Sequence, residues 1–371
     1  MPCGGTQRGG VRRRRRDRRP GREGRRARRA RQPHPCARPV AAARRAWDPP
    51  PLAAPPPAPG PGSDEFARSW YLALRRSATV RAIEVRTFTG SSVTSLLTSD
   101  GFKATGSATG AVVEALLAPT EGPWRLVRFA ARGLADLDCS ALAEQALATV
   151  GAVARGDTAQ RGLTDVVLAP GVAALLVAAL GRRLAAPSPL IHGRIAPAWR
   201  LVDERAGPVG LAPQPFDGEG VPSRPILLVG GGKLHERLAC WRDAAPPRIE
   251  PGGAVRASFC QPPIGGPANL VVHAAAPVPA DQLLATLGRG VVAVLPATAL
   301  EIDDSGRFSL QCAALHIEGG RPAGAYPLIE LRGSLRRLLG GLAACGDDPT
   351  SHSLDCAVTT PSLLVRQLEI A

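Results

Sequence analysis

The sequence predicts an α+β fold, with a small N-terminal α/β segment followed by a strand-rich C-terminal domain around one central buried helix. Three observations support this. An apolar helix pattern lies in the middle of the chain, residues 64–160 mix helix and strand patterns, and residues after 225 form short apolar runs separated by glycine turns. We therefore expect a tail at 1–63, an N-terminal α+β domain at 64–160 and a C-terminal domain at 161–371.

The basic character of the chain lies in its first residues. Residues 1–46 hold 17 arginines against two acids, which accounts for the whole formal net charge of +15. Few apolar residues occur there and a proline-rich stretch follows at 49–62, so residues 1–63 are expected to be disordered. The tail could contact nucleic acid or another anionic surface. Alternatively it is a non-selected extension upstream of the true start, which the near absence of lysine (Lys103 and Lys233 only) favours.

The N-terminal domain is predicted from short patterns. Asp64–Arg76 is expected to be a helix, and its apolar residues include Phe66 and Trp70. Strands are expected at Val80–Phe88, Val93–Thr98 and Trp124–Phe129, and a second helix at Cys139–Val153. We find no residues with catalytic potential in this domain.

The central helix is predicted over Pro170–Ala186. Proline suits its first turn, and Arg182 and Arg183 suit the negative end of its dipole. Residues 172–180 carry no polar group, which predicts burial on all sides. The apolar run of 16 residues from Val166 is shorter than the roughly 20 that a membrane span needs. No His, Glu, Asp or Cys lies between Val166 and Ala186.

Two glycine-rich stretches follow. Irregular chain is expected at Ser188–Val202, and then P-F-D-G-E-G-V-P-S-R-P at 215–225 places Asp217 and Glu219 two residues apart. This acid pair could bind a metal or a peptide amine, but the spacing favours a tight turn in which the carboxylates cap amides. The next stretch, Gly230 to Lys233, is predicted to turn a β-hairpin. It lacks the leading glycine and the Ser or Thr of a phosphate-binding loop.

The C-terminal residues predict strands with few helices. The expected strands are Asn269–His273, Gly290–Leu295, Arg307–Glu318, Tyr326–Leu331 and Leu363–Leu368, and the expected helices are Ala280–Leu287 and a short one capped by Ser334. None of the eight cysteines forms a C-x-x-C pair, and no apolar secretory segment follows the basic tail. We therefore expect reduced thiols and a cytoplasmic protein without a membrane association.

The order of these motifs resembles the TldD/PmbA family of zinc-dependent peptidases and their non-zinc partners. The resemblance runs from about Val80 to the C-terminus. It rests on V-V-L-A-P-G-V-A-A-L-L at 166–176, P-F-D-G-E-G-V-P-S-R at 215–224, the hairpin I-L-L-V-G-G-G-K-L, G-P-A-N-L-V-V at 266–272, G-R-F-S-L-Q-C-A-A-L-H-I-E-G-G at 306–320 and the ending P-S-L-L-V-R-Q-L-E-I-A. It also implies a fuller N-terminal domain, so we expect this one to be truncated or its start misassigned.

The resemblance implies a missing metal site. Catalytic members carry H-E-x-x-x-H on the central helix, with two zinc-binding histidines and a glutamate as general base. In this chain those positions are Val177, Ala178 and Arg182. Valine and alanine offer no lone pair and arginine is a cation, so none can replace the ligands. The departure resembles the TldE (PmbA) branch, whose members pair with a zinc-bearing TldD subunit.

A cysteine near the C-terminus is the third zinc ligand in the catalytic branch. Cys345, His352 and Cys356, with Asp347 and Asp348 nearby, could form a metal site in that region. They are predicted to lie in a loop, and the helix offers no group to meet them. We therefore expect no catalytic, cofactor-binding or metal-binding residue in this chain, and zinc only in a partner subunit.

The function that the resemblance implies is a non-catalytic, TldE/PmbA-like subunit of a heterodimeric zinc metallopeptidase. With a TldD-like subunit it would enclose an unfolded or modified peptide, held in extended form along a sheet edge. The alternatives are a nucleic-acid-binding protein that uses the arginine-rich tail, and an inactive relic of the peptidase family. The residues after 46 have balanced charge and few aromatics, which gives the nucleic-acid alternative little support outside the tail.

Overall fold

The computed structural model describes residues 62–99, 101–188, 193–207, 209–244 and 250–371. The arginine-rich tail therefore lies outside the described residues, apart from its last two positions. Within the described ranges, no helix has both the length and the apolar character needed to cross a bilayer.

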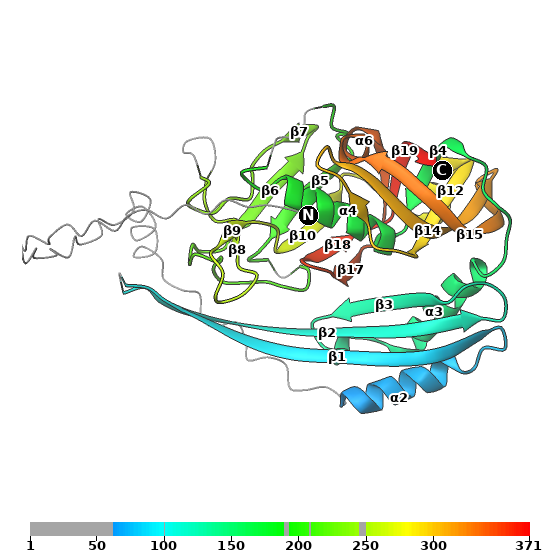
Figure 1. Ribbon diagram of the computed structural model, residues 1–371, viewed down its shortest axis with the longest axis horizontal. Coiled ribbons are helices and arrows are strands. Elements are labelled where there is room, and N and C mark those ends of the chain that lie inside the picture. The colour runs from blue at the N-terminus through cyan, green and yellow to red at the C-terminus, as the bar shows by residue number, and fades with distance from the viewer. Residues whose placement is uncertain (1–61, 100, 189–192, 208, 245–249) are drawn as a thin grey trace, which may run out of the picture. The chain divides into compact units, whose positions relative to one another are not determined.

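The N-terminal segment is a three-stranded antiparallel sheet with helices packed on it (Figure 1). The strand order is β1-β2-β3, and buried residues of both helices, including Trp70 and Ala146, share one core cluster with all three strands. Asp138 caps the second long helix by accepting from the backbone N–H groups of Ser140 and Ala141. The elements are α2 (Ser63–Leu74), β1 (Val80–Leu97), β2 (Lys103–Pro119), β3 (Arg125–Ala131), the 3₁₀ turn η1 (Leu134–Asp136) and α3 (Cys139–Ala152).

The helices of this segment lie where the sequence patterns predict them, but two of its strands differ from the prediction. The two strands expected at Val80–Phe88 and Val93–Thr98 are one strand, β1, because Gly90-Ser91-Ser92 stays paired with Thr109 and its neighbours instead of turning. The long β2 was not predicted at all. Its first half is rich in glycine, serine and threonine, which indicates a loop until the pairing with β1 is known.

The C-terminal domain contains a closed barrel of five strands. The ring runs β4-β12-β14-β15-β19 and closes where β19 pairs antiparallel with β4, while β4 and β12 are parallel. Outside the ring, β16 pairs with β19, β13 pairs with β14, and β11 pairs with β16. The bounds are β4 (Gly162–Leu168), β11 (Pro277–Val278), β12 (Gly290–Pro296), β13 (Glu301–Ile302), β14 (Arg307–Glu318), β15 (Arg321–Ser334), β16 (Leu342–Gly346) and β19 (Leu363–Ile370).

A second sheet of six strands has the order β17-β18-β10-β5-β6-β7. Its members are β5 (Trp199–Glu204), β6 (Pro225–Gly230), β7 (Lys233–Leu234), β10 (Asn269–Ala274), β17 (Thr350–Ser353) and β18 (Ala357–Thr360), and a separate small ribbon pairs β8 (Ala254–Val255) with β9 (Ile264–Gly265). The glycine turn between β6 and β7 is the predicted hairpin turn, with positive φ at Gly231 and Gly232. Strand β5 begins inside the stretch expected to be irregular, because buried Trp199 and Leu201 pair it with β10.

The central helix α4 (Pro170–Arg183) packs against strands of both sheets, including β12 of the barrel and β18 and β10 of the second sheet (Figure 1). Its buried residues share one large core cluster with the barrel and the second sheet. On β4, Val166 and Leu168 join that cluster, whereas Val167 packs in a smaller one with residues of the helix α5 (Ala280–Leu287). Burial on both faces explains why the last three residues of β4, Val166 to Leu168, are all apolar.

Two short helices complete the domain: α5 (Ala280–Leu287) and α6 (Leu335–Gly341). Both were predicted, and Ser334 caps α6 as expected, since its hydroxyl accepts from the N–H of Arg337 at 3.2 Å. The mixed α+β class and the strand-rich C-terminal part agree with the prediction. The barrel closure was not predicted, because it depends on which distant strands pair.

Candidate functional site

The three helix positions at which the catalytic branch carries its H-E-x-x-x-H residues lie on α4 and are differently exposed. Val177 is 0% and Ala178 1% exposed, both inside the large core cluster. Arg182 lies in the last turn with its side chain 45% exposed, and it forms an ion pair with Asp355, which precedes β18. Two positions therefore offer only apolar surface, and the third holds a cation that is already paired.

Cys356 lies near Arg182 and next to its ion-pair partner. Burial, with smaller contributions from the carboxylates of Asp355 and Asp203 and against the opposing charge of Arg182, raises the pKa of the Cys356 thiol to about 12. At neutral pH this sulfur is therefore a protonated thiol, and the form that binds zinc is the thiolate.

The structure corrects the loop predicted around the other candidate ligands. Cys345 lies on β16 and His352 on β17, because both segments pair with neighbouring strands. Burial raises the pKa of the Cys345 thiol to about 12 and lowers that of the His352 imidazole to about 4. Asp348 accepts from the backbone N–H of Ser362 at 2.8 Å and from its hydroxyl at 2.7 Å, which makes it a structural residue.

These candidates do not converge. His352 packs against the first turn of α4, where its Cε1 lies 3.6 Å from the position that a Cβ on Gly171 would take. Arg182 lies 11 residues further along the helix, which corresponds to roughly 16 Å at 1.5 Å per residue. In the described part of the chain, no group of three or more His, Cys, Asp or Glu residues could hold a metal ion. The residues present therefore do not fit zinc.

The acid pair at 215–225 forms the turn that its glycine spacing favours. Asp217 is only 2% exposed, and its Oδ1 accepts from the N–H groups of Glu219 and Val221, each at 2.9 Å. Its Oδ2 accepts from the N–H of Ala254 at 3.1 Å. Burial raises the pKa of Asp217, and these hydrogen bonds oppose the shift. Glu219 accepts from the N–H of Trp241 at 2.7 Å, so both acids connect loops.

A buried ion pair between Arg205 and Asp203 lies next to this turn and was not predicted from the sequence. The Nε of Arg205 donates to Asp203 at 2.8 Å, and both side chains are fully buried. The guanidinium also donates to the carbonyls of Ala254 and Gly266. Because Ala254 lies on β8 and Gly266 follows β9, these hydrogen bonds connect the pair to the β8–β9 ribbon, and breaking the pair would leave an uncompensated buried charge.

The same carboxylate fixes the G-P-A-N motif at 266–269. Asp203 accepts from the backbone N–H of Asn269 at 2.7 Å and from that of Ala268 at 3.2 Å. The Asn269 amide in turn donates to the carbonyls of Glu204 and Val209, each at 2.8 Å. The only sequence signal was an Asp and an Arg two residues apart, which is too common a spacing to indicate a buried pair.

The fold and site together define a class: a strand-rich α+β domain with a five-stranded barrel, whose buried central helix carries no metal ligand. The family profile described as the PmbA/TldA metallopeptidase C-terminal domain matches residues 161–371, so the chain belongs to the TldD/PmbA family. No curated protein matches the chain.

Solved structures with the same fold include three relatives of low identity. One is described as a candidate modulator of a DNA gyrase from Thermotoga maritima, with 21% identity, a TM-score of 0.73 and coverage of 83% of this chain and 74% of that one. A second is TldE from Thermococcus kodakarensis, with 18% identity, a TM-score of 0.72 and coverage of 88% and 79%. A third is described as a candidate modulator of DNA gyrase from Bacteroides thetaiotaomicron, with 20% identity, a TM-score of 0.65 and coverage of 83% and 71%.

Proposed function

We propose that this chain is a non-catalytic, TldE-like subunit of a heterodimeric zinc metallopeptidase. The observation that carries the proposal is the identity of three α4 residues, Val177, Ala178 and Arg182, where a family scaffold is present without metal ligands. The likeness to a TldE structure supports the same assignment. The subunit is proposed to work in the cytoplasm and to need no cofactor of its own.

The partner in this proposal is a TldD-like subunit that carries zinc on an H-E-x-x-x-H helix. The substrate class is an unfolded or modified peptide held in extended form. In such a pair this chain supplies walls and positioning groups. The Arg182–Asp355 pair suits that role, because it covers the end of α4 with a fixed polar contact instead of an open coordination site.

Co-expression with a zinc-bearing subunit encoded by the same genome tests the proposal. We expect the two chains to co-purify and to hydrolyse an unstructured peptide, and this chain alone to leave the peptide intact. The matched control is the complex in which the histidines and glutamate of the partner's helix are replaced, which is expected to assemble but not to cleave. Hydrolysis by that control complex, or failure of the chains to associate, would contradict the proposal.

A further inference from the structure

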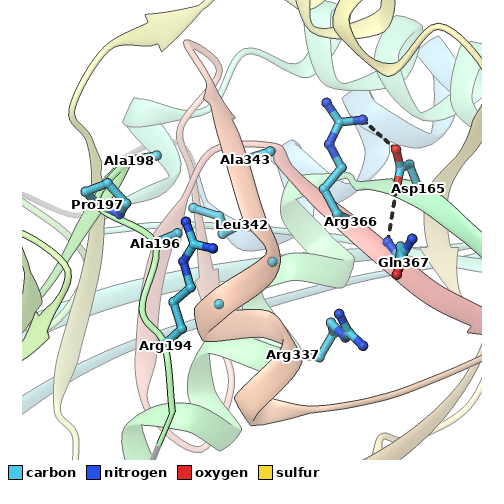
Figure 2. A pocket seen from close by; sticks show the side chains of 12 residues that line it. Asp165, Arg194, Ala196, Pro197, Ala198, Arg337, Leu342, Ala343, Arg366 and Gln367 are labelled. Atoms are coloured by element: carbon cyan, nitrogen blue, oxygen red, sulfur yellow. Dashed lines mark hydrogen bonds and ion pairs between the residues drawn. The ribbon is translucent and has the colours of Figure 1, made fainter.

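A cleft of about 570 Å³ lies on the C-terminal domain, away from the three α4 positions discussed above. Four segments line it: the chain that leads into β5, the end of α6 with the start of β16, the middle of β19, and β4. Figure 2 shows three arginines from three of these segments around it, Arg194, Arg337 and Arg366, together with one acid, Asp165. The volume is typical of a site for a small organic molecule.

The one acid of the cleft is already engaged. An oxygen of Asp165 accepts from Arg366 at 2.5 Å, and its other oxygen accepts from the backbone N–H of Gln367 at 3.0 Å (Figure 2). Among the described residues, neither the Arg194 nor the Arg337 guanidinium has a hydrogen-bond or ion-pair partner. Three guanidinium groups against one carboxylate leave the cleft with a net charge of +2.

The backbone beside Arg366 is strained in a way that shapes the cleft. The register of β19 against β4 shifts between Val365 and Leu368, which marks a bulge. Gln367 has φ +54, the one positive φ at a non-glycine residue in the described ranges. Strained residues of this kind persist only where other contacts hold them, and bulges redirect side chains near functional sites. Here the carboxylate of Asp165 holds the bulge, and the bulge places Arg366 at the cleft.

Two glycines keep the arginine-bearing segments close together. A Cβ on Gly340 would lie 2.8 Å from the carbonyl oxygen of Arg194, and one on Gly341 would lie 3.1 Å from that of Arg366. Both contacts are with backbone, which cannot move away as a flexible side chain would. Larger residues at the end of α6 would therefore push Arg194 and Arg366 apart.

We propose that this cleft binds a small phosphomonoester. A phosphate monoester carries a charge of about −1.5 to −2 at neutral pH, which balances the net +2 of the lining, whereas a monocarboxylate would not. Guanidinium groups bind phosphate oxygens through paired N–H donors. The accessible apolar part of the lining, Pro197, Ala198 and Ala343, gives the organic portion of the molecule a surface to pack on.

Calorimetric titration of the full chain with phenyl phosphate, at constant ionic strength, tests the proposal. We expect saturable binding that falls at least about tenfold in Arg337→Gln and in Arg194→Gln, since each removes a charge-assisted contact. The control is Arg321→Gln. Arg321 is exposed on β15 and lies outside the cleft, and its substitution removes the same charge. It is expected to bind phenyl phosphate as the unchanged chain does.

A second titration, with phenylacetate, distinguishes phosphate from carboxylate recognition. The proposal predicts weaker binding of phenylacetate than of phenyl phosphate. It is overturned if phenylacetate binds as tightly, if Arg321→Gln loses as much affinity as the two cleft variants, or if phenyl phosphate shows no saturable binding. All variants keep the arginine-rich tail, so any binding by the tail is common to them and does not alter the comparison.

Discussion

At the scale of single residues, Arg182 distinguishes this chain most clearly from a zinc enzyme. It pairs with Asp355 next to the buried thiol of Cys356, at the position where catalytic relatives would hold a ligand. The residues at these three helix positions could be predicted from the sequence, because they depend only on the register of one helix. The Asp203–Arg205 pair could not, because its other partners lie some fifty to sixty-six residues further along the chain and meet it only in the folded sheets.

His352 gives a pH-dependent test at the residue scale. The pKa of its imidazole is about 4 in the folded chain because of burial, against 6.5 for an exposed histidine, and its buried Nε2 has no hydrogen-bond partner among the residues that the structure describes. Between pH 6.5 and 4 only the unfolded chain takes up this proton. Stability is therefore lost as pH falls through that window, by up to about 3 kcal/mol.

Urea unfolding of the unchanged chain and of His352→Leu at pH 7 and pH 4.5 measures this loss. We expect the unchanged chain to lose more unfolding free energy than the variant over that interval. Equal losses in the two proteins would mean that His352 is accessible to protons in the folded state.

At the scale of elements, α4 fits between the two sheets because its buried residues carry no polar groups and many of them are small. The end of the helix packs closely on β10, and Gly181 allows that approach because it has no side chain. The helices α3, α5 and α6 and the strand β14 could be predicted almost to the residue, because their patterns and caps are local. The long β2 could not be predicted, since its glycine-rich sequence forms a strand only when a partner strand is present. The barrel closure could not be predicted either, because it depends on the pairing of β19 with the distant β4.

Gly181→Ala tests the packing of α4. A Cβ there would lie 2.5 Å from Cδ1 of Leu270 and 3.3 Å from Cβ of Pro267, inside a close-packed core. Overpacking of this kind costs about 1–3 kcal/mol, which exceeds the roughly 1 kcal/mol gained by replacing a helical glycine with alanine. Denaturant unfolding should therefore show a less stable variant.

The matched control is Gly151→Ala in α3, where an added Cβ meets no atom within 4 Å. This variant is expected to gain about 0.5–1 kcal/mol, since only the helix propensity changes. If Gly181→Ala were stabilised to the same extent, the result would contradict the close packing of α4 against β10 at this position.

At the scale of the whole molecule, the barrel and the second sheet together bury a helix that in catalytic relatives carries the metal site. The chain belongs to a metallopeptidase family and keeps its C-terminal fold, while the groups that perform the chemistry are absent from α4. Outside residues 1–46 the charges balance, so the high isoelectric point describes the tail and not the folded part. These features are the basis for our proposal that activity belongs to a complex with a zinc-bearing subunit.

The most direct measurement is the zinc content of the purified chain, determined by elemental analysis after growth in zinc-supplemented medium and removal of loosely bound metal. We predict far less than one equivalent of zinc per chain, together with no hydrolysis of an unstructured peptide. Zinc near one equivalent, accompanied by hydrolysis without a partner subunit, would contradict it.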